Sequence, residues 1–406
     1  MVARKNGSRR GRPHTKGEMV MAFQPGFDVT EATATLALSQ AIYGVPAIPV
    51  PTPDPHSLGW SKVDALSPSG STLLDNLWQV WRDDTRPNRY AIVVRGTVDS
   101  DASILADLLF PLVDARLDLA IETGGGKLEF PFHLARDEAG SAVVAGTHLG
   151  FSLSLFLMLL TTDRPLLATL AALSLDPDAE ILITGHSQGA SIATLLTSFV
   201  RHASGVFSSI AKPSYKTYVF APAKPGNDHY SYDYAAIAGV AGTGWSVVST
   251  QGWVPQVPFT LQLPGDINTP NPLRDYRGVR NLDVDPRIAA LCATVEPSVE
   301  DAQRQVVAHA CRVAESLKER LAGERLTLDT RLLGAPEAVV LDGTSLAGGI
   351  DSLLSQIQAS LNFATAGNLV PLFAVPGENP DDPTDFFWQH HLGNYWKYLQ
   401  AQYGAA

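Results

Sequence analysis

The chain has 406 residues, of which 45% are apolar and 17% are charged, and its formal net charge is −11. This composition predicts a globular protein with a large core, built as one domain or as one domain with an insertion. The acidic balance disfavours binding to nucleic acid. The two cysteines, Cys292 and Cys311, cannot build a disulfide framework, and we expect both to be reduced and buried in a helical stretch. The sequence has no Cys-x-x-Cys or His-Glu-x-x-His spacing of a metal site. We therefore expect neither a metal nor another cofactor.

The N-terminal segment is basic. Residues Met1 to Lys16 include six basic side chains and no acidic one, and only a short apolar run, Met19 to Phe23, follows. A secretory signal peptide needs an apolar core of about 7–15 residues at this point, so we expect a disordered basic tail over residues 1–25 and a cytoplasmic location. The most apolar run, 150–161, is too short to span a bilayer, and we expect no transmembrane segment.

Apolar periodicity predicts the following elements in chain order. Helical spacing covers residues 29–43, whereas 77–81 alternate like a strand and 90–94 form a β-branched run typical of a buried strand. Further along we expect a strand pair at 127–133 and 141–145, helices at 148–160 and 166–175, a strand at 180–184, a helix at 190–199, and strands at 217–222 and 245–250. Strands that alternate with helices and are nearly continuously apolar predict an α/β fold with a mostly parallel central sheet flanked by helices.

Amphipathic helical spacing dominates the last third of the chain. It covers residues 287–322 and 344–363, so we interpret 283–365 as a helical insertion that caps the sheet. The core of the fold then comprises residues 26–282, and residues 366–406 complete it with a short C-terminal helix.

Residues 98–115 are a candidate lid. Leu105, Leu108, Leu109, Phe110 and Leu112 form an apolar segment directly after a candidate site loop. As a lid, this segment would cover the site and open at a lipid surface. A core helix is the alternative interpretation of the same residues.

The segment from Ile181 to Ser191 carries the strongest chemical signal. A strand-like apolar run enters Gly185-His186-Ser187-Gln188-Gly189, and a helix of small and apolar residues leaves it. The pattern Gly-x-Ser-x-Gly is weak by itself, but a preceding strand and a following helix are what a nucleophile elbow requires. The glycines let strand and helix approach at a sharp turn, which exposes the serine and leaves the next backbone N–H to face an oxyanion. We therefore predict that Ser187 is a nucleophile.

Six ordered motifs together resemble the class 3 lipases of the α/β-hydrolase fold. They are Arg95-Gly96-Thr97 at a strand end, the segment 104–109, His148-Leu149-Gly150-Phe151, the segment 184–189, the segment 220–227 with Pro222 and Gly226, and His390-x-Leu392-x-x-Tyr395. The resemblance runs from about residue 30 to 260, returns at about 370–400, and leaves the helical insertion outside. It implies an α/β-hydrolase fold, an acyl ester or lipid as substrate, and transient contact with a lipid surface.

One position departs from the family pattern. The family usually has Asn-x-x-Asp-x-Val-Pro where this chain has Ser249 to Pro255, so Gly252 occupies the position of the catalytic aspartate. A glycine has no carboxylate, which leaves the acid of the triad unknown. Asp228, after the strand that follows the elbow helix, and Asp266, on a later loop, are two candidates. A solvated loop position is the alternative interpretation of both.

The base and the oxyanion hole follow from chain order and from the resemblance. The α/β-hydrolases place the nucleophile, the acid and the base in that order, so the base comes late in the chain. His390 is the first candidate and His391 is the second. The resemblance implies an oxyanion hole formed by Thr97 and the backbone N–H of Gln188.

Three further polar residues near the motifs are expected to have structural roles. His186 is locked next to Ser187 in the sequence, so packing and hydrogen bonding beside the elbow suit it better than proton transfer. His148 resembles a structural position of the family. Arg95 is expected to anchor a salt bridge.

Together these residues predict a serine ester hydrolase, a lipase or a carboxylesterase, that forms an acyl-enzyme on Ser187. A thioesterase or a phospholipase acting through the same site is one alternative. A catalytically silent binding protein of this fold is another, and the glycine at position 252 is the feature that favours it.

Overall fold

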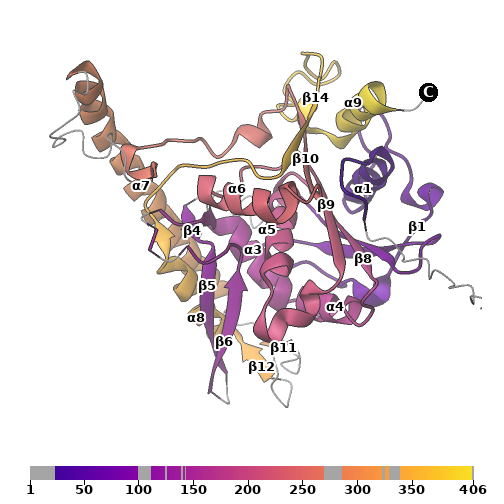
Figure 1. Ribbon diagram of the computed structural model, residues 1–406, viewed down its shortest axis with the longest axis horizontal. Helices are drawn as coiled ribbons and strands as arrows, with labels where there is room; N and C mark the ends of the chain where they lie inside the picture. The colour runs from indigo at the N-terminus through magenta and orange to yellow at the C-terminus, as the bar shows by residue number, and fades with distance from the viewer. Residues whose placement is uncertain are drawn as a thin grey trace, which may run out of the picture.

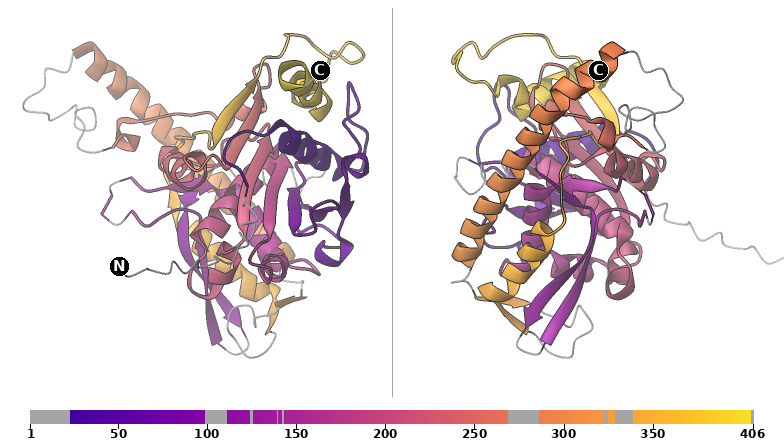
Figure 2. Two further views of the ribbon diagram at one scale, coloured as in Figure 1. Left: turned by 45° about the vertical axis from the view of Figure 1, so that its right-hand side comes forward. Right: turned by 90° about the vertical axis from the view of Figure 1, so that its left-hand side faces the viewer.

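The structure is a computed structural model that describes residues 23–98, 111–123, 126–138, 140–141, 143–268, 286–321, 325–328 and 339–404. Its centre is a seven-stranded sheet with the order β1-β2-β3-β8-β9-β10-β14 (Figures 1 and 2). The five strands from β3 to β14 in this order run parallel, and β1 and β2 add two antiparallel strands at one edge. The expected mostly parallel central sheet is confirmed.

Apart from β1 and β14, which were not predicted, the strands of the central sheet lie close to the predicted segments. They are β1 (Trp60–Lys62), β2 (Trp78–Asp83), β3 (Arg89–Val94), β8 (Glu180–His186), β9 (Ser214–Phe220), β10 (Gly244–Ser249) and β14 (Asn368–Leu372). The smaller sheets contain β4 (Leu112–Asp114), β5 (Arg116–Thr123), β6 (Gly126–His133), β7 (Gly146–His148), β11 (Arg325–Leu328), β12 (Val339–Asp342) and β13 (Ile357–Gln358). Strand β14 pairs with β10, so the C-terminal segment returns to the central sheet.

Helices cover both faces of the sheet (Figure 1). They are α1 (Val29–Ala41), α3 (Leu149–Leu160), α4 (Leu166–Leu173), α5 (Gln188–His202), α6 (Asp228–Tyr234), α7 (Pro286–Leu321), α8 (Gly343–Leu354) and α9 (Leu392–Tyr403). Helices α1 and α9 pack on one face, and α3 and α5 pack on the other. None of the helices in the described ranges is both long enough and apolar enough to cross a membrane.

Strand β8 shows why its sequence is continuously apolar. Ile181 and Ile183 belong to the buried cluster that contains α3 and α5, whereas Leu182 belongs to the cluster that contains α1 and α9. Successive side chains of a strand point to opposite faces, and both faces of this strand are covered. The strand therefore holds its C-terminal end, where Ser187 follows, firmly within the fold.

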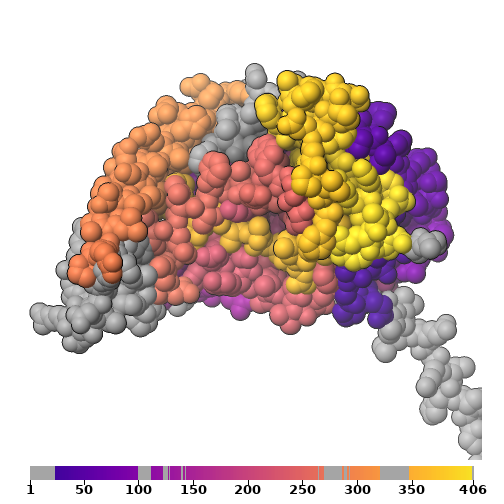
Figure 3. Space-filling view, turned by 90° about the horizontal axis from the view of Figure 1, so that it is seen from above, coloured from indigo at the N-terminus to yellow at the C-terminus, as the bar shows by residue number. Residues whose placement is uncertain are grey.

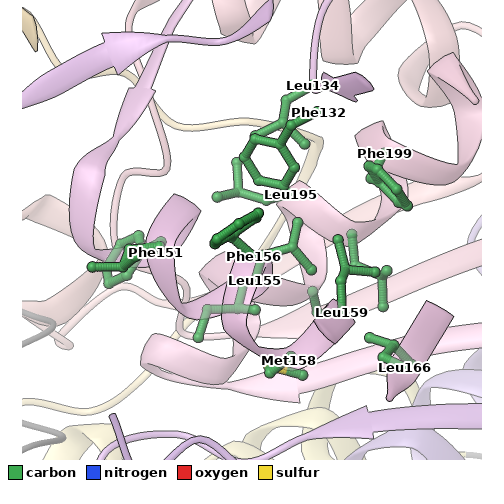
Figure 4. Packing of buried hydrophobic residues seen from close by; sticks show 14 of the residues in the cluster. Phe132, Leu134, Phe151, Leu155, Phe156, Met158, Leu159, Leu166, Leu195 and Phe199 are labelled. Carbon is green, nitrogen blue, oxygen red and sulfur yellow. The ribbon is translucent and has the colours of Figure 1, made fainter. Parts of the chain in front are cut away.

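Helix α3 forms the centre of the larger core. All of its residues are buried, so it shows apolar and small residues all around its axis. Figure 4 shows Phe156 of this helix beside Phe132 and Leu195, and the ring centroids of Phe156 and Phe132 are 6.0 Å apart. This packing connects the second half of α3 with β6 and with the elbow helix α5.

The region expected to be a helical insertion contains more than helices. Helices α7 and α8 lie within 283–365, but so do β11, β12 and β13. Helix α7 runs along one side of the molecule (Figures 2 and 3), and α8 packs on α3 so closely that a Cβ at Gly349 would lie 2.9 Å from Phe156. The domain boundaries stay a prediction.

Three other expectations have different outcomes. The predicted pairing of 127–133 with 141–145 is wrong, because β6 pairs with β5 in an antiparallel hairpin. Cys311, which we expected to be buried, is exposed on α7. Residues 99–110 of the candidate lid lie outside the described residues, and part of the remainder forms the buried strand β4.

Candidate active site

Ser187 occupies a strained turn between β8 and α5. Its backbone has φ 59° and ψ −131°, a conformation that non-glycine residues rarely adopt. The turn is held because the Ser187 N–H donates to the carbonyl oxygen of Phe220 on the neighbouring strand, over 3.0 Å. A strained serine between a strand and a helix is the geometry of a nucleophile elbow.

The two glycines of the motif are required by close packing. A Cβ at Gly185 would lie 2.5 Å from the backbone oxygen of Gly189. A Cβ at Gly189 would lie 2.3 Å from the backbone oxygen of Val94 at the end of β3. Backbone atoms of a central sheet cannot move away cheaply, so only glycine fits at these two positions.

Ser187 lies on the wall of a cavity of about 910 Å³. The cavity brings together most of the predicted site: its lining includes Thr97, Ser187, Gln188, His390 and His391. The remaining lining is mostly apolar and aromatic, and includes Phe151, Ala223, Trp253, Val254, Val257, Pro258, Phe259, Phe387 and Leu392. A large apolar cavity with a few converging polar groups is the usual form of a binding site for a small molecule.

His390 lies beside the elbow. It ends the short 3-10 helix Trp388–His390, is 5% exposed, and its ring centroid is 4.4 Å from that of His186. His186 is the residue before Ser187, and its Nε2 donates to the carbonyl oxygen of His390 over 2.9 Å. The structure thus places the first candidate base in contact with the residue that precedes the candidate nucleophile, and both candidates line the same cavity.

No carboxylate of the described residues bonds the ring of His390. Its Nδ1 is buried without a hydrogen-bond partner within the described ranges. In a Ser-His-Asp triad this nitrogen carries the hydrogen that the acid accepts. Burial lowers the pKa of His390 well below that of a free imidazole, and the neighbouring imidazoles of His186 and His391 lower it further. Burial therefore favours a neutral His390, and no carboxylate of the described residues orients its ring.

Position 252 has room for a side chain. The nearest atoms to an added Cβ are Ser249 Cβ at 3.5 Å, and the Gln389 carbonyl oxygen and Tyr395 Oη at 3.6 Å, all ordinary contact distances. Gln389 directly precedes His390 in the chain. The glycine thus lies beside the segment that carries the candidate base, as expected for the family's acid position.

The second histidine has a carboxylate partner that sequence reasoning missed. His391 Nε2 lies 2.9 Å from Asp385 Oδ2, and both residues line the cavity. Asp385 also accepts hydrogen bonds from Asn379 Nδ2 and from the N–H of Phe387, and its pKa is lowered, because these bonds outweigh the cost of burial. In the sequence, Asp385 is recognisable only as a carboxylate shortly before the histidine pair. Chain order alone does not favour this aspartate over the others that lie between Ser187 and His390.

The two candidate acids lie elsewhere. Asp228 Oδ2 accepts from Asn362 Nδ2 over 3.0 Å, and Asp266 accepts from the Leu263 N–H and from Ser360 Oγ. Neither residue lines the cavity or hydrogen-bonds to His390 or His391. Their contacts are those of loop-fixing residues.

Thr97 and Gln188 flank Ser187 in the cavity wall. Gln188 is the first residue of α5, and the first N–H groups of a helix lack partners within the helix and favour negative charge. The Gln188 side chain is turned away, because its Oε1 accepts from Asn76 Nδ2 over 3.1 Å. Their placement suits the backbone role predicted for the oxyanion hole.

Two of the three residues that were expected to be structural, His148 and Arg95, have structural contacts. His148 is the N-cap of α3, where its Nδ1 accepts from the Phe151 N–H over 3.4 Å and its ring stacks on Phe151 at 3.8 Å. Arg95 pairs with Asp75 over 2.9 Å. Within the described ranges, no group of three or more His, Cys, Asp or Glu side chains could hold a metal ion.

Comparison with known structures finds fungal lipases. The native Rhizomucor miehei lipase propeptide complex is 18% identical, with a TM-score of 0.38, and the match covers 58% of this chain and 65% of that chain. The Rhizomucor miehei triacylglyceride lipase is 17% identical over 58% of this chain and 77% of that chain, with a TM-score of 0.39. A lipase from Rhizopus microsporus var. chinensis is 16% identical over 63% and 79%, with a TM-score of 0.38.

These structural similarities are too low to support a conclusion about activity, and no curated protein matches the chain. A comparison with protein families is more informative, because residues 91–262 match the class 3 lipases. This region contains β3, the elbow, α5 and position 252. The match to this family indicates an α/β-hydrolase fold and the activity of a carboxylic-ester hydrolase. The expected resemblance to the class 3 lipase family is therefore confirmed, over a region that covers less than half of the chain.

Proposed function

We propose that the protein is a serine ester hydrolase, a lipase or carboxylesterase, that cleaves acyl esters through an acyl-enzyme on Ser187. The observation that carries this proposal is the strained Ser187, with φ 59°, on the wall of an apolar cavity of about 910 Å³ that also contains His390. Backbone strain of this kind persists only where the surrounding structure maintains it, and it is most frequent at functional sites.

The mechanism follows from these positions. The ester carbonyl carbon is attacked by Ser187 Oγ while Nε2 of His390 takes the serine proton. The oxyanion of the tetrahedral intermediate accepts hydrogen bonds from Thr97 and from the Gln188 N–H. The intermediate then collapses, and the leaving alcohol takes the proton back from His390. A water molecule, deprotonated by the same histidine, attacks the acyl-enzyme and releases the acid.

The cavity suits an apolar acyl group, and its rim suits a lipid surface. Trp253, Phe259 and Phe387 line the cavity and are 43%, 79% and 47% exposed, and Phe386 beside them is 79% exposed. Large exposed apolar groups in one place mark binding surfaces. Acyl esters with apolar chains are therefore the substrates we expect, and thioesters or phospholipids are the alternatives for the same site.

Ser187→Ala tests the proposal. We expect the wild type to hydrolyse a nitrophenyl butyrate or a longer ester, and the variant to lose at least about three orders of magnitude in kcat while keeping its Tm, because the acyl-enzyme can no longer form. A variant that keeps more than about a tenth of the wild-type kcat would show that Ser187 is not the nucleophile.

The alternative of a catalytically silent binding protein predicts a different result. A folded wild type that hydrolyses no nitrophenyl ester, thioester or phospholipid would favour a binding protein. A series of chain lengths then separates the enzymes, since an esterase prefers short soluble esters and a lipase prefers long ones.

A further inference from the structure

A chain of hydrogen bonds connects three residues behind the nucleophile. Tyr43 Oη lies 2.9 Å from His186 Nδ1, and His186 Nε2 lies 2.9 Å from the carbonyl oxygen of His390. The three residues come from the end of the first helical segment, from the end of β8, and from the C-terminal segment. His186 and His390 are both buried, with exposed fractions of 7% and 5%.

The direction of these bonds can be assigned. A carbonyl oxygen only accepts hydrogen bonds, so His186 Nε2 must carry its hydrogen. A neutral His186 then has a lone pair on Nδ1, which accepts the hydroxyl hydrogen of Tyr43. Burial lowers the pKa of His186 to about 4, which agrees with a neutral ring. His186 therefore does not serve as a base, but it is a fixed donor that points at the backbone of His390.

This donor matters because His390 lacks the usual orienting group. A triad acid fixes the orientation and tautomer of its histidine. Here Nδ1 of His390 has no partner within the described ranges, and position 252 has no side chain. The ring is held by packing instead: the His186 ring lies at 4.4 Å with an interplanar angle of 36°, and the Phe387 ring lies at 5.8 Å.

We propose that Tyr43 and His186 are positioning residues that hold His390 against the elbow and take over part of the orienting task of the missing acid. Tyr43 keeps His186 in one tautomer and one orientation. His186 in turn fixes the backbone of His390 by its hydrogen bond and the ring by contact. Neither residue exchanges a proton with the substrate. The inference rests on the proposed function, since it takes His390 as the base.

Tyr43→Phe is the sharpest test, because it removes one hydroxyl and keeps the ring. With a soluble nitrophenyl ester we expect kcat to fall about tenfold or more, since small displacements of a catalytic group are costly, and KM to stay within about twofold. The matched control is Tyr230→Phe, which removes a buried hydroxyl that lies 2.9 Å from Ser198 Oγ and does not line the cavity. Both variants should lose a similar few degrees in Tm, but only Tyr43→Phe should lower kcat.

Substitutions of His186 provide a second test of the proposal. His186→Gln can still donate to the His390 carbonyl from its amide, whereas His186→Leu cannot, and we expect the glutamine variant to keep a kcat several-fold higher than the leucine variant. Equal kcat values for the wild type and Tyr43→Phe, at equal KM, would overturn the inference and leave the proposed function intact. A wild type that hydrolyses no ester and whose Ser187 does not react with a fluorophosphonate would overturn both.

Discussion

At the scale of single residues, the proposed site combines a candidate nucleophile in a well-formed elbow with a candidate base that lacks a carboxylate partner. Nδ1 of His390 is buried without an acceptor. A hydrogen on that nitrogen would be an unsatisfied buried donor, which costs about 1–3 kcal/mol, so the tautomer with the hydrogen on Nε2 is favoured. That tautomer cannot take the proton of Ser187. We therefore expect a slow enzyme, because only the minor tautomer of His390, with its hydrogen on Nδ1, can accept the proton of Ser187.

Gly252→Asp tests this reasoning. The backbone at Gly252 is not in the left-handed region, an added Cβ makes only ordinary contacts, and Tyr395 Oη, which accepts from the Ser249 N–H, can donate its own hydrogen to a new carboxylate. We expect kcat to rise by about tenfold or more, as a fraction of the roughly 10⁴ that a triad acid contributes. Gly252→Asn is the matched control, since it has nearly the same shape but no charge. An aspartate variant that keeps its Tm and is slower than wild type would argue against an acid position at 252.

Some of these positions could be predicted from the sequence and others could not. Ser187, Thr97, Gln188 and the histidine pair lie around one cavity, and each was chosen from a local motif; their catalytic roles stay predictions. The contacts of Tyr43 and Asp385 were not predicted, because they depend on how loops fold back over the sheet. The sequence around Tyr43 and around Asp385 contains no pattern that predicts their hydrogen-bond partners.

At the scale of elements, the elbow depends on how closely β8 and α5 approach β3. The same tight packing explains why the elements of the core were predicted well, since a strand covered on both faces must be apolar throughout. The strands β11, β12 and β14 were missed because they are short, and short runs give little periodicity.

Gly189→Ala tests the packing of the elbow. The new Cβ would lie 2.3 Å from the Val94 backbone oxygen, so β3 or α5 must shift, and we expect a loss of about 2–3 kcal/mol in the free energy of unfolding. Gly70→Ala is the control, since nothing lies within 4 Å of its Cβ and its φ is not positive. Urea unfolding of both variants measures the difference. An alanine at 189 that costs no more than one at 70 would show that strand and helix are less closely packed than described.

At the scale of the whole molecule, buried histidines such as His148 and His186 connect stability to pH. Burial lowers the pKa of His148 to about 3 and that of His186 to about 4. Below pH 6.5 the unfolded chain takes up protons at both residues while the folded protein does not. The free energy of unfolding should therefore fall as the pH falls from 6.5 to 5, by about 1.6 kcal/mol for each histidine.

His148→Asn isolates one of these contributions. Asparagine can accept the same helix-capping hydrogen bond but does not titrate. Urea unfolding between pH 5 and 7.5 should show a slope with pH that is shallower than that of the wild type by about one proton per molecule at pH 5. Identical slopes would mean that His148 is protonated in the folded protein at this pH.

The proposed activity requires a reactive Ser187 with His390 as its base. Labelling by a fluorophosphonate, followed by peptide mass spectrometry, measures this most directly, because the reagent bonds to an activated serine and requires no knowledge of the natural substrate. We predict a single adduct on Ser187, none in Ser187→Ala, and labelling at least about 100-fold slower in His390→Ala, while His391→Ala stays within about tenfold of the wild type. An adduct on another residue, or a rate that depends on His391 and not on His390, would contradict it.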